Sequence, residues 1–233
     1  NSIEELYVIS TEVSTIALAA SAEGAGISSI NISQSTADGN VIDVSAYTTL
    51  NTTLVGSATN TNRLVGGGGQ DVITGGSGSD TITGGNGSDT ITGGAGADSL
   101  LGGEGDDVFI FVSEDEFSED ATVDGGSGTD TIKMSTGSAA VVLENTDFTN
   151  VVGMETLNLA GTGAQSVTLG ADTDSAFASG MTIKTQASAA GLNLQGSASK
   201  VAINATGTNK SDTLIGGAGN DTFIGSAGVD SLF

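Results

Sequence analysis

The sequence predicts an all-β protein, a parallel β-roll or β-solenoid with little or no helix. Two observations predict this fold class. A glycine-rich unit of nine residues repeats without a gap, and short apolar-x-apolar triplets recur through the rest of the chain. Both features are typical of short strands separated by tight turns. No stretch shows the 3.6-residue period of an amphipathic helix of useful length.

The nine-residue unit reads G-G-x-G-x-D-x-U-x, where U is a large apolar residue. Five consecutive copies occupy residues 66–110, a sixth stands at 125–133, and two more occupy 216–233. Degenerate copies at 57–65 and 207–215 lose most of the glycines but keep Asn or Asp at position six and Leu at position eight. We expect these degenerate copies to form the first turn of each array.

A longer repeat is also visible in the sequence. Residues 3–8 match 154–159 at an offset of 151 residues, and residues 62–67 match 212–217 at an offset of 150. The chain is therefore a tandem duplication of a strand-rich segment followed by a repeat array. We expect five segments: a solenoid segment at 1–56, a repeat array at 57–110, an acidic loop with one repeat at 111–133, a second solenoid segment at 134–206 that duplicates the first, and a truncated second array at 207–233.

The two solenoid segments carry the triplets that we expect to form strands. Two short stretches, residues 19–25 and 174–179, are expected to form single helical turns. The triplets are Leu6/Val8, Ile16/Leu18, Ile30/Ile32, Val141/Leu143, Leu157/Leu159, Val167/Leu169, Met181/Ile183, Leu192/Leu194 and Val201/Ile203.

The repeat itself predicts a metal. Glycines allow tight turns, and two units make one solenoid turn, so the aspartates of alternate units stack about 4.8 Å apart. Carboxylates at that spacing repel one another unless a cation lies between them, and carboxylate plus carbonyl oxygens suit Ca²⁺. One buried apolar residue per unit does not offset the entropy of ordering nine residues, so we expect calcium to drive folding. The expected columns are Asp71, Asp89 and Asp107 on one edge, and Asn62, Asp80 and Asp98 on the other.

The composition limits the other functions that are open to this chain. The formal charge is −23, and His, Cys, Pro and Trp are absent. Catalysis by Ser-His-Asp or Cys-His, zinc sites of the His/Cys type and disulfides are therefore excluded. The acidic charge disfavours nucleic acid and anionic membranes, and no apolar run reaches the ~20 residues that span a bilayer.

An acidic run interrupts the first array between residues 111 and 124. For Glu114–Asp120 we expect a solvated acidic loop, which is the commoner role of such a run. Asp124 is the exception, because it directly precedes Gly125 and is expected to add a calcium ligand.

These nonapeptides resemble the repeats of the RTX family of secreted bacterial proteins. The resemblance implies export by type I secretion and folding on meeting external calcium. It also implies calcium ligands from the position-six side chains and from the loop carbonyls of neighbouring turns, with Asn62 in place of Asp. Carried over to this sequence, the expected ligands are Asp71, Asp80, Asp89, Asp98, Asp107, Asp130, Asp212, Asp221, Asp230 and Asn62, with the loop residues Gly66, Gly68, Gly75, Ser77, Gly84, Asn86, Gly93, Ala95, Gly102 and Glu104.

Three functions remain open at this stage. The first is a non-catalytic structural protein of the bacterial cell surface, either an S-layer subunit or a self-assembling fibre. The second is the extender region of a large RTX adhesin, and the third is the secretion and folding module of an RTX protease, lipase or toxin. The expected partners are several calcium ions, further copies of the chain in a lattice or filament, and a cell-surface polysaccharide; we expect no nucleic acid and no membrane insertion.

Overall fold

The structure is a computed structural model that describes residues 5–120, 122–187 and 189–233. The chain divides into two compact units, one of residues 1–109 and 119–128 and one of residues 110–118 and 129–233. Within the described ranges, no helix has the length and apolar character needed to cross a membrane.

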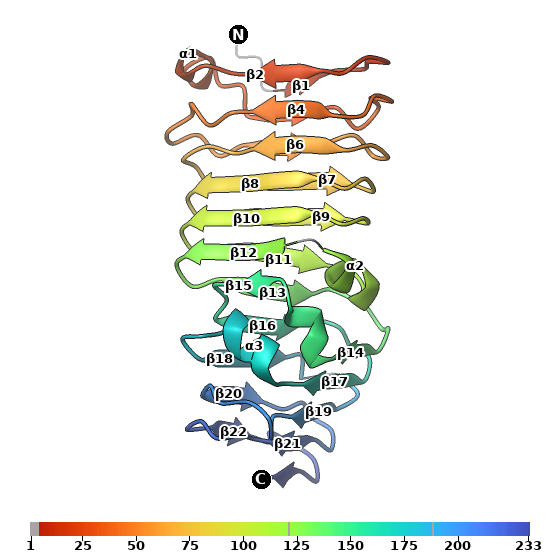
Figure 1. Ribbon diagram of the computed structural model, residues 1–233, viewed down its shortest axis with the longest axis vertical. Coiled ribbons are helices and arrows are strands. Elements are labelled where there is room, and N and C mark those ends of the chain that lie inside the picture. The colour runs from red at the N-terminus through yellow and green to blue at the C-terminus, as the bar shows by residue number, and fades with distance from the viewer. Residues whose placement is uncertain (1–4, 121, 188) are drawn as a thin grey trace. The chain divides into compact units, whose positions relative to one another are not determined.

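The first unit is built from two parallel sheets whose strands alternate along the chain (Figure 1). One sheet has the order β1 (Glu5–Tyr7), β3 (Ser29–Asn31), β5 (Thr53–Val55), β7 (Val72–Gly76), β9 (Thr90–Gly94) and β11 (Val108–Phe111). The other has the order β2 (Thr15–Ala17), β4 (Asn40–Asp43), β6 (Asn62–Val65), β8 (Thr81–Asn86), β10 (Ser99–Glu104) and β12 (Thr122–Ser127).

The register of these sheets places one inward residue in each strand of the array. Ile73 pairs with Ile91 across β7 and β9, and Leu64 pairs with Ile82 across β6 and β8. All four side chains are buried, and they belong to position eight of their nonapeptides. Because paired residues of the array lie 18 positions apart, two nonapeptides make one turn. The predicted β-roll is therefore confirmed.

The second unit repeats the arrangement with two rows of parallel strands. One has the order β13 (Thr131–Met134), β16 (Thr156–Leu159), β18 (Met181–Thr185), β20 (Ile203–Thr206) and β22 (Thr222–Ile224). The other has the order β14 (Val141–Leu143), β17 (Gln165–Thr168), β19 (Leu192–Gln195), β21 (Thr213–Ile215) and β23 (Ser231–Leu232); a short strand, β15, covers Val151–Val152.

One predicted triplet of the second unit is wrong. Val201 lies before the strand and is only half-buried, whereas β20 buries Ile203 and Ala205. Alanine at the inward position conceals this strand from a search for large apolar residues.

The helices are short, as predicted, but two of them were not predicted. α1 (Ala20–Glu23) falls in the expected stretch, and α3 (Ala171–Ala176) begins earlier than expected. The 3₁₀ helix η1 (Asn145–Phe148) was not foreseen. The expected solvated loop is wrong, because α2 (Glu114–Glu119) forms there and buries the side chains of Glu116 and Phe117.

Four phenylalanines, from β11, α2, η1 and the end of α3, pack together in the core of the second unit. The ring centroids of Phe111 and Phe117 lie 5.0 Å apart, those of Phe117 and Phe148 5.3 Å, and those of Phe148 and Phe177 5.9 Å. All four side chains are buried. Tilted and edge-on contacts at these distances add to the gain from burial.

The order of elements recurs along the chain. The series from β1 to β8 has the same order of strands as the series from β16 to β23, and α1 and α3 fall at the same point in each. Glu23 and Asp174, which are 151 residues apart, each accept a backbone hydrogen bond from a loop of the next turn. Glu23 accepts the N–H of Thr49 at 2.7 Å, and Asp174 accepts the N–H of Lys200 at 3.0 Å. Backbone donors from Thr49 and Thr48 lower the pKa of Glu23 to about 2.

Candidate metal centre

The position-six aspartates of the first array form two hydrogen-bonded columns. In one, the N–H of Asp71 donates to Oδ1 of Asp89 at 2.7 Å, and the N–H of Asp89 donates to Oδ1 of Asp107 at 2.8 Å. In the other, the N–H of Asp80 donates to Oδ1 of Asp98 at 2.7 Å. The predicted stacking is confirmed, and one oxygen of each accepting carboxylate is used to join neighbouring turns.

The second oxygen of these carboxylates points at a glycine of its own loop. A Cβ added to Gly75 would lie closer than 3.0 Å to both Asp80 Oδ2 and the carbonyl oxygen of Gly93. The same holds at Gly84, where the two oxygens are Asp89 Oδ2 and the carbonyl of Gly102. Glycine is therefore required at position one, because carboxylate and carbonyl oxygens from two turns converge there.

The second glycine of each loop differs in whether its N–H donates a hydrogen bond to Oδ2 of the position-six aspartate. Gly67, in the first clean nonapeptide, donates its N–H to Asp71 Oδ2 at 2.8 Å. In the following nonapeptides Gly76 and Gly85 adopt φ of +149° and +124°, a conformation that L side chains rarely adopt. Oδ2 of Asp80 and Oδ2 of Asp89 are buried and accept no hydrogen bond.

This arrangement fits a calcium ion. The Oδ2 atoms of Asp80 and Asp89 face other acceptors, so they need a cation rather than a hydrogen-bond donor. Burial raises the pKa of Asp80 to about 6 and that of Asp89 to about 7. Calcium supplies positive charge that favours the ionised carboxylates, and its oxygen ligands here would be Oδ2 and the loop carbonyls. No three carboxylates converge among the described residues, so the carbonyls are an essential part of the site.

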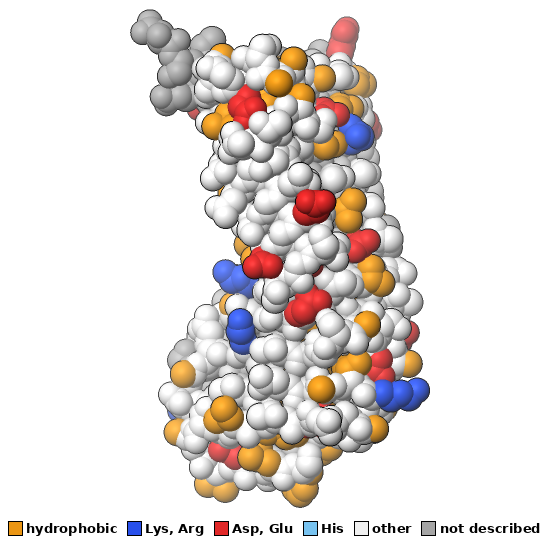
Figure 2. Space-filling view, turned by 90° about the vertical axis from the view of Figure 1, so that its left-hand side faces the viewer, with side chains coloured by type: hydrophobic (Ala, Val, Ile, Leu, Met, Phe, Trp, Pro, Cys, Tyr) orange, Lys and Arg blue, Asp and Glu red, His pale blue; other side chains and the backbone are white. Residues whose placement is uncertain are grey.

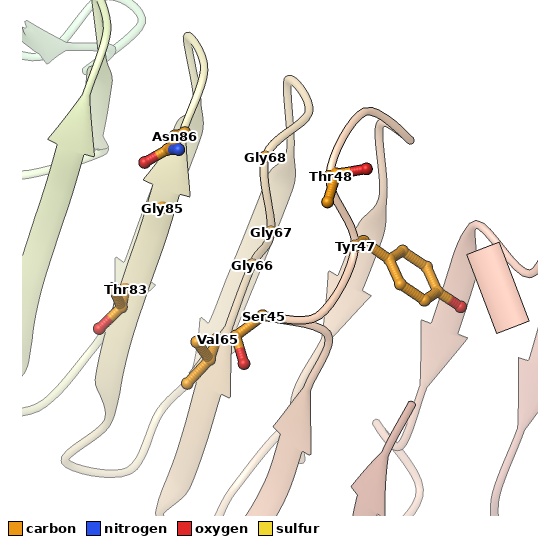
Figure 3. A pocket seen from close by; sticks show the side chains of 10 residues that line it. All are labelled: Ser45, Tyr47, Thr48, Val65, Gly66, Gly67, Gly68, Thr83, Gly85 and Asn86. Carbon is orange, nitrogen blue, oxygen red and sulfur yellow. The ribbon is translucent and has the colours of Figure 1, made fainter. Parts of the chain in front are cut away.

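The glycine loops at residues 66–68 and 85–86 line a hollow together with Ser45, Tyr47 and Thr48. In Figure 3, Gly66, Gly67 and Gly68 follow one another along one turn, and Gly85 and Asn86 lie on the neighbouring turn. The Tyr47 ring points away from this glycine backbone. Any side chain at the glycine positions would reduce the space between the turns.

Residues at position three of the loops hold neighbouring turns together through the backbone. Their N–H groups donate to carbonyl oxygens of the preceding turn, and the carbonyl of Glu104 accepts the N–H of Gly87 at 2.7 Å. A calcium-ligating role for these residues stays a prediction. The donor–acceptor pairs are Ser77 to Ala58 at 3.2 Å, Asn86 to Gly67 at 2.8 Å, and Ala95 to Gly76 at 3.1 Å.

The second array repeats the Oδ1 hydrogen bonds of the first, but it differs from Asp80 and Asp89 at Oδ2. The N–H of Asp212 donates to Oδ1 of Asp230 at 3.1 Å, and the N–H of Ile203 donates to Oδ1 of Asp221 at 2.9 Å. Oδ2 of Asp212 accepts the N–H of Thr208, and Oδ2 of Asp221 accepts the N–H of Gly217. These two carboxylates, like Asp71, therefore have a donor for each oxygen.

Two acidic residues of the columns escaped the sequence analysis. The N–H of Asp98 donates to Oδ1 of Asp120 at 3.2 Å, so the buried Asp120 extends its column, whereas a solvated loop was expected. The N–H of Asp130 donates to Oε2 of Glu155 at 2.8 Å, so Glu155 stands in a position-six place. Asp124 lies instead on β12, where its carboxylate accepts the N–H of Gly126.

A signal for both residues exists in the sequence. Glu155 precedes the inward Leu157 by two residues, as Asp130 precedes Ile132. Asp120 lies five residues before Gly125, one more than the four that separate Asp98 from Gly102. A search that allowed Glu at position six and a one-residue insertion would have found them.

Much of the acidic charge is withdrawn from the surface. Asp71, Asp80, Asp89, Asp98 and Asp107 are all at most 2% exposed. The face in Figure 2 carries only scattered acidic side chains and is mostly neutral. Part of the acidic charge is therefore buried inside the array rather than exposed on its surface.

Comparison with known proteins supports calcium binding by the two arrays. A family profile described as an RTX calcium-binding nonapeptide repeat, present in four copies, matches residues 57–91, 83–110 and 206–233. No curated protein and no solved structure matches the chain. The matched ranges coincide with the two arrays whose carboxylates and glycine loops are described above. The two arrays are therefore RTX calcium-binding nonapeptide repeats, and such repeats bind several calcium ions.

Proposed function

We propose that this chain is a structural component of the bacterial cell surface that folds on calcium and assembles with further copies of itself, as an S-layer subunit or a fibre does. The observation that carries the proposal is the tandem duplication, which repeats strand order, helix position and the loop hydrogen bonds of Glu23 and Asp174. A series of equivalent modules suits a structural role, because each turn contacts only its neighbours.

The composition supports a non-catalytic role. The chain has neither His nor Cys, and its acidic residues that are placed in columns are engaged in linking turns. RTX repeat proteins are generally secreted or extracellular, which fits a location where calcium is abundant. An extender region of an adhesin shares the modular layout, and it would be distinguished by the absence of self-assembly.

Electron microscopy of the purified chain tests the proposal. We expect ordered sheets or filaments after addition of calcium, and none with chelator or with magnesium alone. Particles that remain single chains at every calcium concentration would contradict self-assembly and favour the extender region. Sedimentation of the double variant Asp80→Ala/Asp89→Ala is the matched control, because assembly should fail when the first array loses these carboxylates.

A further inference from the structure

One edge of the first unit carries amide side chains where the array carries carboxylates. Asn40 pairs with Asn62 between β4 and β6, and the N–H of Asn62 donates to Oδ1 of Asp80 at 2.7 Å. Asn62 is 4% exposed and Asn40 is fully buried. The column of Asp80 and Asp98 is therefore continued by two asparagines in the preceding turns.

The amide of Asn62 is surrounded by oxygen atoms. Its Nδ2 lies 2.7 Å from the carbonyl oxygen of Asn60 and 2.8 Å from Asp80 Oδ1, which accounts for its two hydrogens. The carbonyl oxygens of Ser57 and Gly75 lie 3.2 Å and 3.4 Å away. Its Oδ1 accepts the N–H of Ser57 at 2.8 Å, so the bonding network fixes which end of the amide faces the carbonyls.

The same place is taken by a carboxylate oxygen in the turns of the array. A Cβ added to Gly56 would meet the carbonyl of Gly75 and Nδ2 of Asn62, whereas a Cβ added to Gly75 would meet the carbonyl of Gly93 and Oδ2 of Asp80. Loop carbonyls thus face a donor in the first case and an acceptor in the second. Only the second arrangement needs a cation.

We infer that Asn62 decides where calcium binding begins: its amide group stands in for a calcium ion and closes the first turn of the array without metal. One neutral NH₂ group supplies hydrogens to the oxygens that a cation would otherwise hold together. The first turn is then complete at low calcium, and the turn of Asp80 is the first on this edge to require an ion. This inference rests on calcium binding by the repeats and not on self-assembly.

Two further amides support the same role outside the array. Asn40 donates through Nδ2 to the carbonyl of Ala37 at 2.5 Å and accepts the N–H of Ser14 at 3.1 Å. In the second unit, the buried Gln165 donates through Nε2 to the carbonyls of Leu159 and Gly161 at 3.2 and 3.0 Å. Each amide satisfies carbonyls of its own loop in a turn that lacks the glycine-rich motif.

The variant Asn62→Asp tests the inference in the full-length chain. We expect native mass spectrometry at saturating calcium to show one more bound ion than in the wild type. We also expect hydrogen exchange in chelator to show lost protection at residues 53–65. Asn204→Asp is the matched control, because Asn204 is exposed on β20 and the same chemical change there should alter neither result.

The reciprocal variant Asp80→Asn keeps the test decisive if Asn62→Asp fails to fold. It should bind fewer ions than the wild type, and residues 72–80 should be better protected in chelator. An unchanged ion count in Asn62→Asp with unchanged protection would overturn the inference. So would a lower ion count in Asp80→Asn without any gain of protection in chelator.

Discussion

The array at residues 57–110 and the segment at residues 134–206 use the same kind of turn but fill it differently. Among the described residues, the array buries six apolar side chains and the segment buries nineteen, although the segment is only about a third longer. The segment also holds Phe148 and Phe177 of the aromatic cluster. The array has instead a pair of acceptors facing each other at Asp80 and at Asp89.

The difference shows that two regions built from the same kind of turn can have different sources of stability. Burial of apolar surface stabilises the segment at any calcium concentration, at ~1.5–3 kcal/mol for each large side chain. The array cannot rely on that contribution, because most of its interior is glycine backbone and carboxylate. We therefore expect its folding free energy to come mainly from metal binding, as in other small metal-dependent modules.

The largest expected effect comes from removing the centre of the aromatic cluster. Phe148 is fully buried and contacts both Phe117 and Phe177. Phe148→Ala should destabilise the second unit by about 3–5 kcal/mol, because it removes a buried ring and leaves a cavity. Chemical denaturation in saturating calcium, followed by circular dichroism, measures this loss. The calcium midpoint for folding of the first array should stay unchanged, and a large shift would show that the two regions are not independent.

The next effect is the loss of a single carboxylate from the array. Asp89→Ala removes the carboxylate that faces Gly102 together with the Oδ1 bond from Asp71, and it offers no amide hydrogens in place of the ion. Interactions of a charged group are worth about 1.5–3 kcal/mol. The calcium midpoint should therefore rise by about 10- to 100-fold. Asp172→Asn, on the short helix α3, is the control that lowers the charge equally, and an equal shift in both variants would indicate a general charge effect.

A methyl group added at the first glycine of a loop should weaken calcium binding by a smaller amount, and only at that position. Gly84→Ala places a Cβ against Asp89 Oδ2 and the carbonyl of Gly102, and crowding of this kind costs ~1–3 kcal/mol. Gly137 is a matched control: its φ of +62° costs ~1–2 kcal/mol for alanine, but its surroundings are open. Calcium titration of both variants should show weaker binding only in Gly84→Ala. Weaker binding in both would point to backbone strain rather than blocked ligands.

The pH dependence should be the mildest effect. Calcium needs ionised carboxylates, and burial raises the pKa of Asp89 to about 7, so lowering the pH from 7 to 6 should weaken calcium binding by up to ~10-fold. In chelator, folding stability depends on pH in the opposite sense. A carboxyl whose folded pKa lies above its unfolded value stabilises the fold at low pH and loses this contribution as the pH rises through 6 to 7. Calcium titrations at several pH values measure the first trend, and a midpoint that does not move would contradict it.

Sequence reasoning predicted the parts of this molecule that are strictly periodic. The spacing of Asp71, Asp89 and Asp107, and of the inward Ile73 and Ile91, determines the columns and the core, because every turn has the same length. The tandem duplication was visible for the same reason.

The rest depends on features that periodicity does not record. Asp120 was missed because a single inserted residue breaks the count before Gly125, and Ala205 was missed because a small residue fills an inward position. The role of Asn62 depends on which end of its amide faces the carbonyls of Asn60 and Ser57, and only the folded loop determines that orientation.

Hydrogen exchange of the full-length chain, measured peptide by peptide in calcium and in chelator, tests the central claim most directly. We expect residues 72–109 to be protected in calcium and to exchange at the rate of an unfolded chain in chelator. Residues 156–205 should stay protected in both conditions, because apolar burial rather than metal stabilises them. An array that remains protected in chelator, or a segment 156–205 that loses its protection together with the array, would contradict this account.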